Sequence, residues 1–277
     1  MSARAVVDEC VRIARRAGAL LTEMQRSPRT VTEKGRADLV TDADRAAEAL
    51  ITDALSSRFP GARLLLEEGG ARAIDGTGHE GLLFIVDPVD GTTNYAAMNP
   101  HYAVSIGVAR DGVVTGGVVV DPARGETFVA VKGEGARLFA RDDDEGTPLA
   151  VSSTDALKDS VLASGFPYTR YTDRDDNHAE FVALNLLTRG CRRNGAATLD
   201  LAWVAAGRFD GYWEQGLKAW DLAAGVLLVE EAGGRATDYA GGDVRVQEGR
   251  VVATNGRVHD AITRVLARVQ AARARGA

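Results

Sequence analysis

Cysteine is scarce in this sequence of 277 residues, which contains only Cys10 and Cys191. Two cysteines cannot supply the set of disulfides that stabilises small secreted domains, so a reduced, cytoplasmic setting is expected. The four histidines are scattered along the chain and form no cluster with cysteine at the spacing of a zinc site. Disulfide scaffolds and zinc-binding modules are therefore excluded as the basis of the fold.

Excess positive charge and long apolar runs are also lacking. The formal net charge is -6, whereas proteins that mainly bind nucleic acid usually carry a basic face. Nucleic-acid binding is therefore not expected as the main task of this protein. Any anion must then be held locally, by metal ions, backbone amides or a few basic side chains. Residues 1–21 mix acidic and basic residues with apolar ones, so neither a signal peptide nor a membrane span is expected. Repeats, low-complexity tracts and long linkers are absent from the sequence.

Hydrophobic residues make up 45% of the chain and charged residues 26%, a balance typical of globular proteins. Apolar spacing predicts helices at residues 3–24, 42–59, 177–189, 197–206, 222–232 and 258–274. It predicts strands at 63–66, 82–86, 102–109, 113–120, 126–131, 161–164, 211–214 and 251–254. Glu48 is expected on the outer face of the second helix, and residues 28–38 are expected to form a loop or a short hairpin.

The connections of this pattern indicate the fold class. Short turns at Asp111-Gly112 and at residues 121–125 join three consecutive strands, which must therefore pair in antiparallel fashion. Strands mixed with helices around such a meander predict a layered α+β sandwich. The length suits one domain, 1–277, and the acidic loop at 141–147 divides it into an N-terminal half (1–145) and a C-terminal half (146–277).

Carboxylates at the ends of predicted elements carry the functional signal. Glu67 follows one strand, Asp87 and Asp90 follow the strand that is expected to end at Asp87-Pro88, and Asp221 stands at the start of a helix. If these ends lie side by side, the acids repel one another unless a divalent cation binds, Mg²⁺ first and then Mn²⁺ or Ca²⁺. Taken singly, each acid could equally be a helix cap or a turn former.

Small residues follow the second pair of acids. Gly91, Thr92 and Thr93 would offer backbone N–H groups to a phosphate if a helix begins there. Metal ions beside a phosphate cradle favour phosphoryl transfer to water.

Four segments resemble the signatures of the inositol monophosphatase family. The first is FIVDPVDGTTNY at 84–95, and the second is LKAWDLAAG at 217–225 together with EEAGG at 230–234. Glu67-Glu68 resembles the acidic pair of the family, and DLVTDAD at 38–44 resembles its N-terminal element. Leu66 departs from the glycine that many relatives have before this acidic pair, which removes no predicted ligand. The resemblance extends over almost the whole chain.

This resemblance implies an α-β-α-β-α sandwich of the inositol monophosphatase and fructose-1,6-bisphosphatase type. It implies hydrolysis of a small phosphate monoester by metal-activated water, with inositol 1-phosphate favoured as the phosphorylated polyol substrate. Relatives with the same metal site act on fructose 1,6-bisphosphate, histidinol phosphate, phosphoadenosine phosphate or NADP. Two further expectations are a homodimer and, as the alternative to an enzyme, a regulatory partner protein that retains the fold.

The resemblance also assigns the metal ligands. Glu67, Asp87 and the backbone carbonyl of Val89 would bind a first Mg²⁺. Asp87, Asp90 and Asp221 would bind a second, with Asp87 bridging the two ions. A weaker third ion would depend on Glu67 and water, and Mn²⁺ is a possible substitute.

Catalytic and substrate-binding residues follow by the same carry-over. Thr92, with Asp44, would orient and deprotonate the attacking water, and Glu67 would share in catalysis. The amides of Gly91 and Thr92 would hold the phosphate. The residues expected to contact the substrate are Asp90, Gly91, Thr92, Gly195, Ala196, Ala197, Glu214 and Asp221.

Basic and aromatic residues outside these motifs leave alternatives open. Lys34 and Arg36 could close over the phosphate or belong to a solvated loop. Arg192-Arg193 could support a subunit interface or the approach of phosphate, and an ordinary surface pair is equally plausible. Phe166-Pro167-Tyr168 could contribute to a dimer interface.

Overall fold

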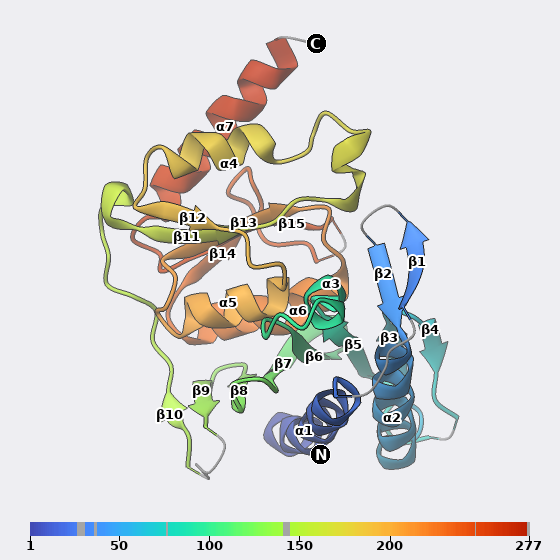
Figure 1. The fold of residues 1–277 in the computed structure, drawn as a ribbon. Helices are drawn as coiled ribbons and strands as arrows, with labels where there is room; N and C mark the ends of the chain where they lie inside the picture. Colours follow the sequence, from blue (N-terminus) through green and yellow to red (C-terminus); the bar gives the residue numbers. More distant parts are fainter. Residues whose placement is uncertain (27–30, 36–37, 76, 141–144, 247, 276–277) are drawn as a thin grey trace.

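Helices and sheets alternate in layers in the computed structural model, which describes residues 1–26, 31–35, 38–75, 77–140, 145–246 and 248–275 (Figure 1). One outer layer consists of α1 (Ala3–Met24) and α2 (Asp42–Arg58), and the other of α4 (His178–Asn185) and α7 (His259–Arg275). Between the two sheets lie α5 (Ala197–Ala205) and α6 (Ala219–Glu231). The predicted α-β-α-β-α sandwich is therefore confirmed.

The larger sheet contains, among the described residues, eight strands in the order β10-β9-β8-β7-β6-β5-β3-β4. Their bounds are β3 (Arg63–Leu66), β4 (Gly70–Ala73), β5 (Leu82–Asp90), β6 (Ala103–Arg110), β7 (Val113–Asp121), β8 (Glu126–Val131), β9 (Gly135–Phe139) and β10 (Thr147–Pro148). The meander β6-β7-β8 is antiparallel, as predicted, whereas β3 and β5 run parallel. Parallel pairing runs as far as Leu66 and Val86, so Glu67, just after β3, comes to the same edge as Asp87 in the last part of β5.

The smaller sheet has, within the same described ranges, five strands in the order β12-β11-β13-β15-β14. Their bounds are β11 (Val161–Ser164), β12 (Gly190–Arg192), β13 (Gly211–Gln215), β14 (Arg235–Thr237) and β15 (Arg250–Thr254). Before α2, β1 (Val31–Gly35) pairs with β2 (Asp38–Thr41), which confirms the hairpin alternative for that segment. Short helical turns complete the chain: α3 (Thr92–Ala96), η1 (Leu157–Asp159) and η2 (Tyr168–Tyr171).

Small residues on β7 set how closely the helices approach the larger sheet. On one face, a Cβ at Gly117 would lie 2.8 Å from the carbonyl oxygen of Ala224, which is in α6. On the other face, a Cβ at Gly116 would collide with Val7 of α1. Because both positions are glycine, α1 and α6 lie directly on the sheet, and the first turn of α6 reaches the end of β5.

Two sequence-based expectations about individual residues are wrong. Glu48 does not point outward, because its side chain is buried and its carboxylate accepts a 2.9 Å hydrogen bond from the backbone N–H of Glu68. The strand at 82–86 does not end at Asp87-Pro88 but continues to Asp90 through an irregularity in its pairing with β6. Both errors concern polar residues that tertiary contacts turn inward, which single-element patterns cannot reveal.

Several predicted boundaries also shift. Helix α4 ends at Asn185 instead of residue 189, because the backbone N–H of Arg189 already bonds to the carbonyl of Ser160 beside the smaller sheet. Helix α6 begins at Ala219 instead of residue 222, which places Asp221 inside its first turn. In the predicted loop at 141–147, residues 141–144 lie outside the described residues, and the division into halves stays a prediction. None of the helices described is long and apolar enough to span a bilayer.

Candidate active site

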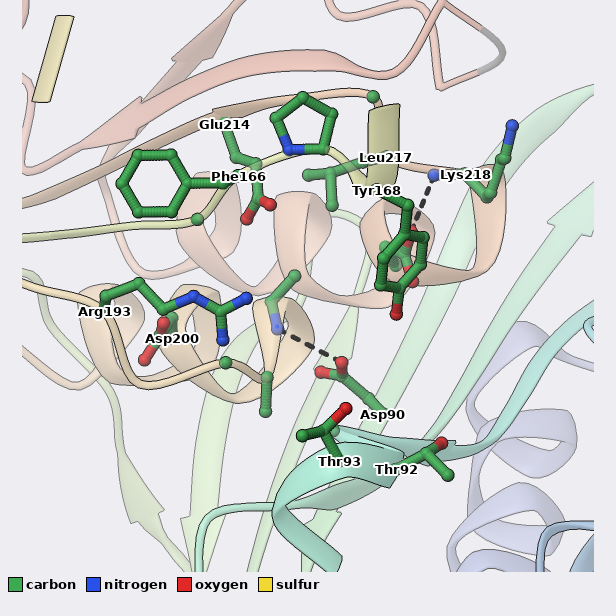
Figure 2. A pocket seen from close by; sticks show the side chains of 18 of the residues that line it. Asp90, Thr92, Thr93, Phe166, Tyr168, Arg193, Asp200, Glu214, Leu217 and Lys218 are labelled. Atoms are coloured by element: carbon green, nitrogen blue, oxygen red, sulfur yellow. Dashed lines mark hydrogen bonds between the residues drawn. The ribbon is translucent and has the colours of Figure 1, made fainter. Parts of the chain in front are cut away.

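A cavity of about 460 Å³ opens where β5, α3 and the first turns of α5 and α6 meet (Figure 2). Residues far apart in the sequence line it together. The predicted site residues among its lining are Glu67, Asp90, Gly91, Thr92, Gly195, Ala196, Ala197, Glu214 and Asp221. Of the remaining predicted residues, Asp87 and Val89 lie beneath the lining on β5, and Asp44 lies behind Thr92.

The irregularity at the end of β5 is what turns two acids to one side. Asp87 pairs with Ser105 and Asp90 with Ala103, so three steps along β5 oppose two along β6. In a regular strand, residues three apart point to opposite faces, and the extra residue of a bulge cancels that alternation. Pro88 has no N–H to lose from the ladder, and the N–H of Val89 donates to Asp87 Oδ1 at 3.0 Å.

Carboxylate oxygens of Asp87, Asp90 and Asp221 all lie within 4.8 Å of one another. Asp221 is the third residue of α6, and its Oδ2 accepts a 2.6 Å hydrogen bond from the N–H of Lys218. Burial, and then the negative charge of Asp90, raises the pKa of Asp221 to about 8. Burial, followed by the charges of Glu67, Asp90 and Asp221, raises the pKa of Asp87 well above its usual range.

This cluster has the chemistry of a site for a hard divalent cation. All its donors are oxygens, and among the described residues no arginine, lysine or histidine forms an ion pair with any of the three acids. Burial first, and then repulsion between the acids, raises the pKa values of Asp87 and Asp221. A bound cation would remove that repulsion, so the residues present fit a metal ion.

Glu67 reaches the cluster from the neighbouring strand. Its backbone N–H bonds to the carbonyl of Val86 at 3.3 Å, which continues the pairing of β3 with β5. The turn that follows is held by Glu48, whose carboxylate takes the N–H of Glu68 and lies so near Gly69 that a Cβ there would be 2.9 Å from Oε1. Glu48 therefore supports the position of Glu67. The sequence pattern did not predict this contact, because it placed the side chain of Glu48 on the outer face of its helix.

Thr92 and Asp44 form a hydrogen-bonded pair beside the cluster. Thr92 Oγ1 lies 2.8 Å from Asp44 Oδ1 and 3.0 Å from the carbonyl oxygen of Val89. The other oxygen of Asp44 accepts from the N–H of Thr41 at 2.9 Å and from its hydroxyl at 2.5 Å. The first of these bonds, together with the bond from the N–H of Asp44 to Thr41 Oγ1 at 3.4 Å, forms the capping box of α2. Asp44 is fully buried, and this burial raises its pKa although the hydrogen bonds from Thr41 and Thr92 oppose the shift.

The N-terminus of α3 faces the same cavity. Gly91 precedes it with φ +89°, and no side chain caps the helix. A Cβ at Gly91 would lie 3.0 Å from the carbonyl oxygen of His101 and 3.1 Å from that of Gly195. Glycine is therefore required both for the left-handed backbone and for the close approach of the opposite segment. Uncapped N–H groups at such a turn suit an anion.

Asp90 connects the two sides of the cavity. Its carboxylate accepts hydrogen bonds from the N–H of Ala197 at 3.2 Å and from the N–H and hydroxyl of Thr198 at 2.7 and 2.6 Å. It thereby caps α5, whose own N-cap, Ala196, has no side chain able to do so. The segment before α5 is held again by Asn94, which donates to the carbonyls of His101 at 2.7 Å and Asn194 at 2.8 Å.

Glu214 faces the cavity from β13. Its carboxylate accepts a hydrogen bond from the hydroxyl of Tyr212, and it lies so near Gly165 that any Cβ there would collide with it. Burial raises the pKa of Glu214 to about 7, although the Tyr212 hydrogen bond and the positive charge of Arg193 act against the shift.

Sequence reasoning missed part of the lining. Phe166, Pro167 and Tyr168, expected near a dimer interface, form one wall of the cavity, and Phe166 is stacked on His178 at 4.6 Å between ring centroids. Leu217 and Lys218 also line it and belong to the second signature, which was the available signal. The side chain of Lys34 and all of Arg36 lie outside the described residues.

Asp200 was missed because its surroundings are assembled only in the fold. It lines the cavity from α5, and Oδ1 takes a 2.7 Å hydrogen bond from Asn194 and lies 3.2 Å from His101 Nε2. Apart from the spacing of α5 itself, nothing in the sequence connects these three positions.

Comparisons with known proteins identify the family of this chain. The model of the inositol monophosphatase family matches residues 3–271. An inositol-1-monophosphatase of Synechocystis is 42% identical over 252 residues, covering 91% of this chain and 85% of the relative. The Nus factor SuhB of Pseudomonas aeruginosa is 44% identical over 237 residues, with 84% of each chain covered. The structure of an inositol monophosphatase from Anabaena (Nostoc) superposes with a TM-score of 0.84 at 41% identity and 96% coverage of both chains. The chain therefore belongs to the inositol monophosphatase family of phosphoric monoester hydrolases.

Proposed function

We propose that this protein hydrolyses inositol 1-phosphate to inositol and phosphate with the help of Mg²⁺. One observation supports this most: three acids on β5 and α6 converge beside a hydrogen-bonded Thr92–Asp44 pair and an uncapped helix N-terminus. The chain is also similar to proteins named inositol-1-monophosphatase from Synechocystis and from Rhizobium meliloti, at 42% and 41% identity.

The residues that would hold the metal are those assigned from the family motifs. Glu67, Asp87 and the carbonyl of Val89 would bind one Mg²⁺, and Asp87, Asp90 and Asp221 a second. A third ion would depend on Glu67, and Mn²⁺ is a possible substitute. When bound, such ions supply the positive charge that stabilises the attacking and leaving oxygens and eases deprotonation of water.

The pair Thr92–Asp44 would handle the proton of the attacking water. The Thr92 hydroxyl donates a hydrogen bond to Asp44 Oδ1, so its lone pairs are left to accept a hydrogen bond from water. Threonine alone is no base, whereas burial raises the pKa of Asp44 and so improves its ability to take a proton. Glu67, at the edge of the same cavity, would share in orienting the water.

Substrate would be held between the two sides of the cavity. The amides of Gly91 and Thr92 would bind the phosphate at the start of α3. Asp90, Gly195, Ala196, Ala197, Glu214 and Asp221 would contact the alcohol part. The alternative substrates are fructose 1,6-bisphosphate, histidinol phosphate, phosphoadenosine phosphate and NADP. Loops around a shared metal site can determine which of these esters is hydrolysed.

A regulatory role is the second candidate function. It is favoured by the 44% identity to a protein named Nus factor SuhB. The retained acids and the Thr92–Asp44 pair favour an enzyme first, because a purely regulatory protein has no need of them. In either role we propose a cytoplasmic homodimer.

The test is phosphate release from a panel of these esters, with and without Mg²⁺. We expect Mg²⁺-dependent release, fastest from inositol 1-phosphate and inhibited by Li⁺. The Asp90→Asn variant should lose activity while its circular dichroism spectrum is kept. Because Asp90 also caps α5, Thr198→Val is the matched control: it loosens the cap, keeps the acid and should retain most activity. Full turnover by Asp90→Asn would contradict the metal assignment, and no release from any ester would favour the regulatory role.

A further inference from the structure

We propose that Arg193 is a specificity-determining residue, which selects substrates whose alcohol part carries several neighbouring hydroxyl groups. Its guanidinium donates a hydrogen bond to a hydroxyl oxygen, while Glu214 accepts a hydrogen bond from the same or the adjacent hydroxyl. This inference rests on the proposed function and adds Arg193 to the residues that recognise the alcohol part of its substrate.

The place of Arg193 in the cavity is the first support. It follows β12 and lines the cavity, and Figure 2 shows its guanidinium pointing inward between Asp200 and Glu214. The guanidinium lies directly over Gly195, since a Cβ at that position would meet Arg193 Nη1. The φ of +90° at Gly195 also disfavours any residue with a side chain, so the space over this loop is kept for the guanidinium.

The second support is that Arg193 has no partner in the part of the chain that the structure describes. Arg189 and Arg208, by contrast, are paired with Asp159 and Glu126 at 2.9 and 2.6 Å. Neither Glu214 nor Asp200 lies within ion-pair distance of Arg193, although its positive charge acts to lower the pKa of both carboxyls. A guanidinium offers five N–H donors, and those of Arg193 are available to a ligand in the cavity.

The loop that carries Arg193 is held in place before any ligand binds. Asn94 fixes the carbonyl of Asn194, the next residue, at 2.8 Å. Farther along the same segment, Asp90 accepts hydrogen bonds from the N–H groups of Ala197 and Thr198. Contacts made by a fixed loop cost little ordering entropy on binding. An arginine at this position can therefore discriminate between alcohols.

The charges around Arg193 favour a polyol over a second phosphate. Two carboxylates, Glu214 and Asp200, lie on either side of it, and they would repel a second anionic group at this end of the substrate. A hydroxyl group both donates and accepts a hydrogen bond, so it satisfies Glu214 and Arg193 together. A site with paired donor and acceptor rejects an alcohol that leaves both groups without a partner.

The experiment compares two substrates in three proteins under saturating Mg²⁺. myo-Inositol 1-phosphate carries hydroxyls next to the ester, and p-nitrophenyl phosphate carries none. The proteins are wild type, Arg193→Gln and the matched control Arg192→Gln, whose side chain makes one hydrogen bond to the described residues, at 3.5 Å to the carbonyl of Cys191. Inhibition of p-nitrophenyl phosphate hydrolysis by myo-inositol is measured in parallel.

We expect Arg193→Gln to lower kcat/KM for the inositol ester by about 10- to 100-fold, the range for losing a hydrogen bond to a charged group. The value for p-nitrophenyl phosphate should change less than about threefold, and inhibition by myo-inositol should weaken in parallel. Arg193→Lys should recover part of the loss, and Arg192→Gln should behave as wild type.

Equal losses on both substrates would overturn the inference, because they would mean that Arg193 acts on the phosphate or on folding. A loss in Arg192→Gln as large as that in Arg193→Gln would overturn it too, since general positive charge would then be responsible. If the wild type hydrolyses p-nitrophenyl phosphate but prefers bisphosphates, the inference fails while phosphatase activity stands. If the wild type hydrolyses no ester, the proposed function fails and the inference with it.

Discussion

The two walls of the cavity are built in different ways. We call the side formed by Asp44, Asp87, Asp90 and Thr92 the phosphate wall, and the side formed by Phe166, Tyr168, Arg193, Glu214 and Leu217 the alcohol wall. Asp44, Asp87 and Asp90 in the phosphate wall are at most 8% exposed, and their oxygens accept hydrogen bonds from the backbone or from threonine. In the alcohol wall, Tyr168 is 60% exposed and Arg193 has no partner among the described residues.

This difference suggests a division of tasks, in which the phosphate wall carries out the reaction and the alcohol wall selects the substrate. The phosphate wall consists of a bulged strand and two helix starts, and Asp44, Asp90 and Thr92 each make two or more hydrogen bonds there. The alcohol wall combines Glu214 of β13 and Tyr168 of η2 with Phe166, Arg193 and Leu217, which lie on connecting segments. Functional variation is expected on such segments while the scaffold is retained. The following predictions test this contrast, starting with the largest expected effect.

Asp87→Asn in the phosphate wall should abolish metal-dependent activity, by about 10³-fold or more, because a divalent ion loses its central charged ligand. The same change should stabilise the metal-free protein, since burial and three neighbouring acids raise the pKa of Asp87. Relief of about 1 kcal/mol would raise the metal-free Tm by about 2–4 °C. Differential scanning calorimetry with and without Mg²⁺ measures both effects, and Mg²⁺ should stabilise only the wild type.

The matched control is Asp210→Asn, a buried acid outside the cavity. Asp210 accepts hydrogen bonds from the N–H of Val161 and from the hydroxyl of Ser152, so its loss should lower the Tm and spare activity. If both substitutions lower the Tm of the metal-free protein, repulsion in the phosphate wall is not the dominant force there.

Thr92→Val should lower kcat by about 10²- to 10³-fold with little change in KM. Valine keeps the shape of the side chain but cannot donate to Asp44 or accept from water, and a positioned proton-transfer group contributes in this range. Thr92→Ser keeps the hydroxyl and should retain most of the rate. Steady-state kinetics on inositol 1-phosphate decide the matter: a valine variant with more than half the wild-type kcat would exclude the pair from the reaction.

The phosphate wall could be predicted from sequence because its residues are consecutive or stand beside strand ends. Asp87 to Thr92 form one run, and Glu67 and Asp221 end or begin elements whose apolar pattern is plain. The bulge could not be predicted, since Asp87 and Asp90 reach the same side only through pairing with Ser105 and Ala103. The sequence predicted that the strand ends at Asp87-Pro88. That prediction places the two acids in a turn but does not show that their side chains point to the same side.

The alcohol wall could be predicted only in part. Gly195, Ala196, Ala197 and Glu214 came from the family resemblance, whereas Arg193 had no more weight than its neighbour Arg192. The guanidinium of Arg193 lies over Gly195, a contact that only the three-dimensional structure reveals. The inward turn of Glu48 depends likewise on the backbone of Glu68. Pattern reasoning thus succeeded where contacts follow the chain and failed where one side chain meets a distant backbone.

Asn94 lies between the two walls, and its removal should affect the alcohol wall more than the reaction. Asn94→Ala loses hydrogen bonds to the carbonyls of His101 and Asn194, so we expect a loss of about 2 kcal/mol in the free energy of unfolding. The released loop should raise KM for inositol 1-phosphate by about 5- to 10-fold, with a smaller change in kcat. Asn99→Ala, which removes a single 3.0 Å bond to Asn94, is the control and should cost much less. A variant that loses kcat with unchanged KM would place Asn94 in the phosphate wall.

The smallest expected effect is a pH dependence confined to the alcohol wall. Burial raises the pKa of Glu214 to about 7, so the carboxyl is protonated below that pH and becomes a stronger, purely accepting group above it. Inhibition by myo-inositol should therefore strengthen about threefold as pH rises through the pKa of Glu214, and Glu214→Gln should abolish this change.

The charge of Asp90 is one cause of the raised pKa of Glu214, and a cation bound beside Asp90 would cancel part of that effect. The midpoint in the Mg²⁺-loaded enzyme should then lie below 7, and inhibition constants measured between pH 5.5 and 8.5 will show whether it does. Strengthening as pH falls would have the wrong sign and would remove Glu214 from the recognition of hydroxyl groups.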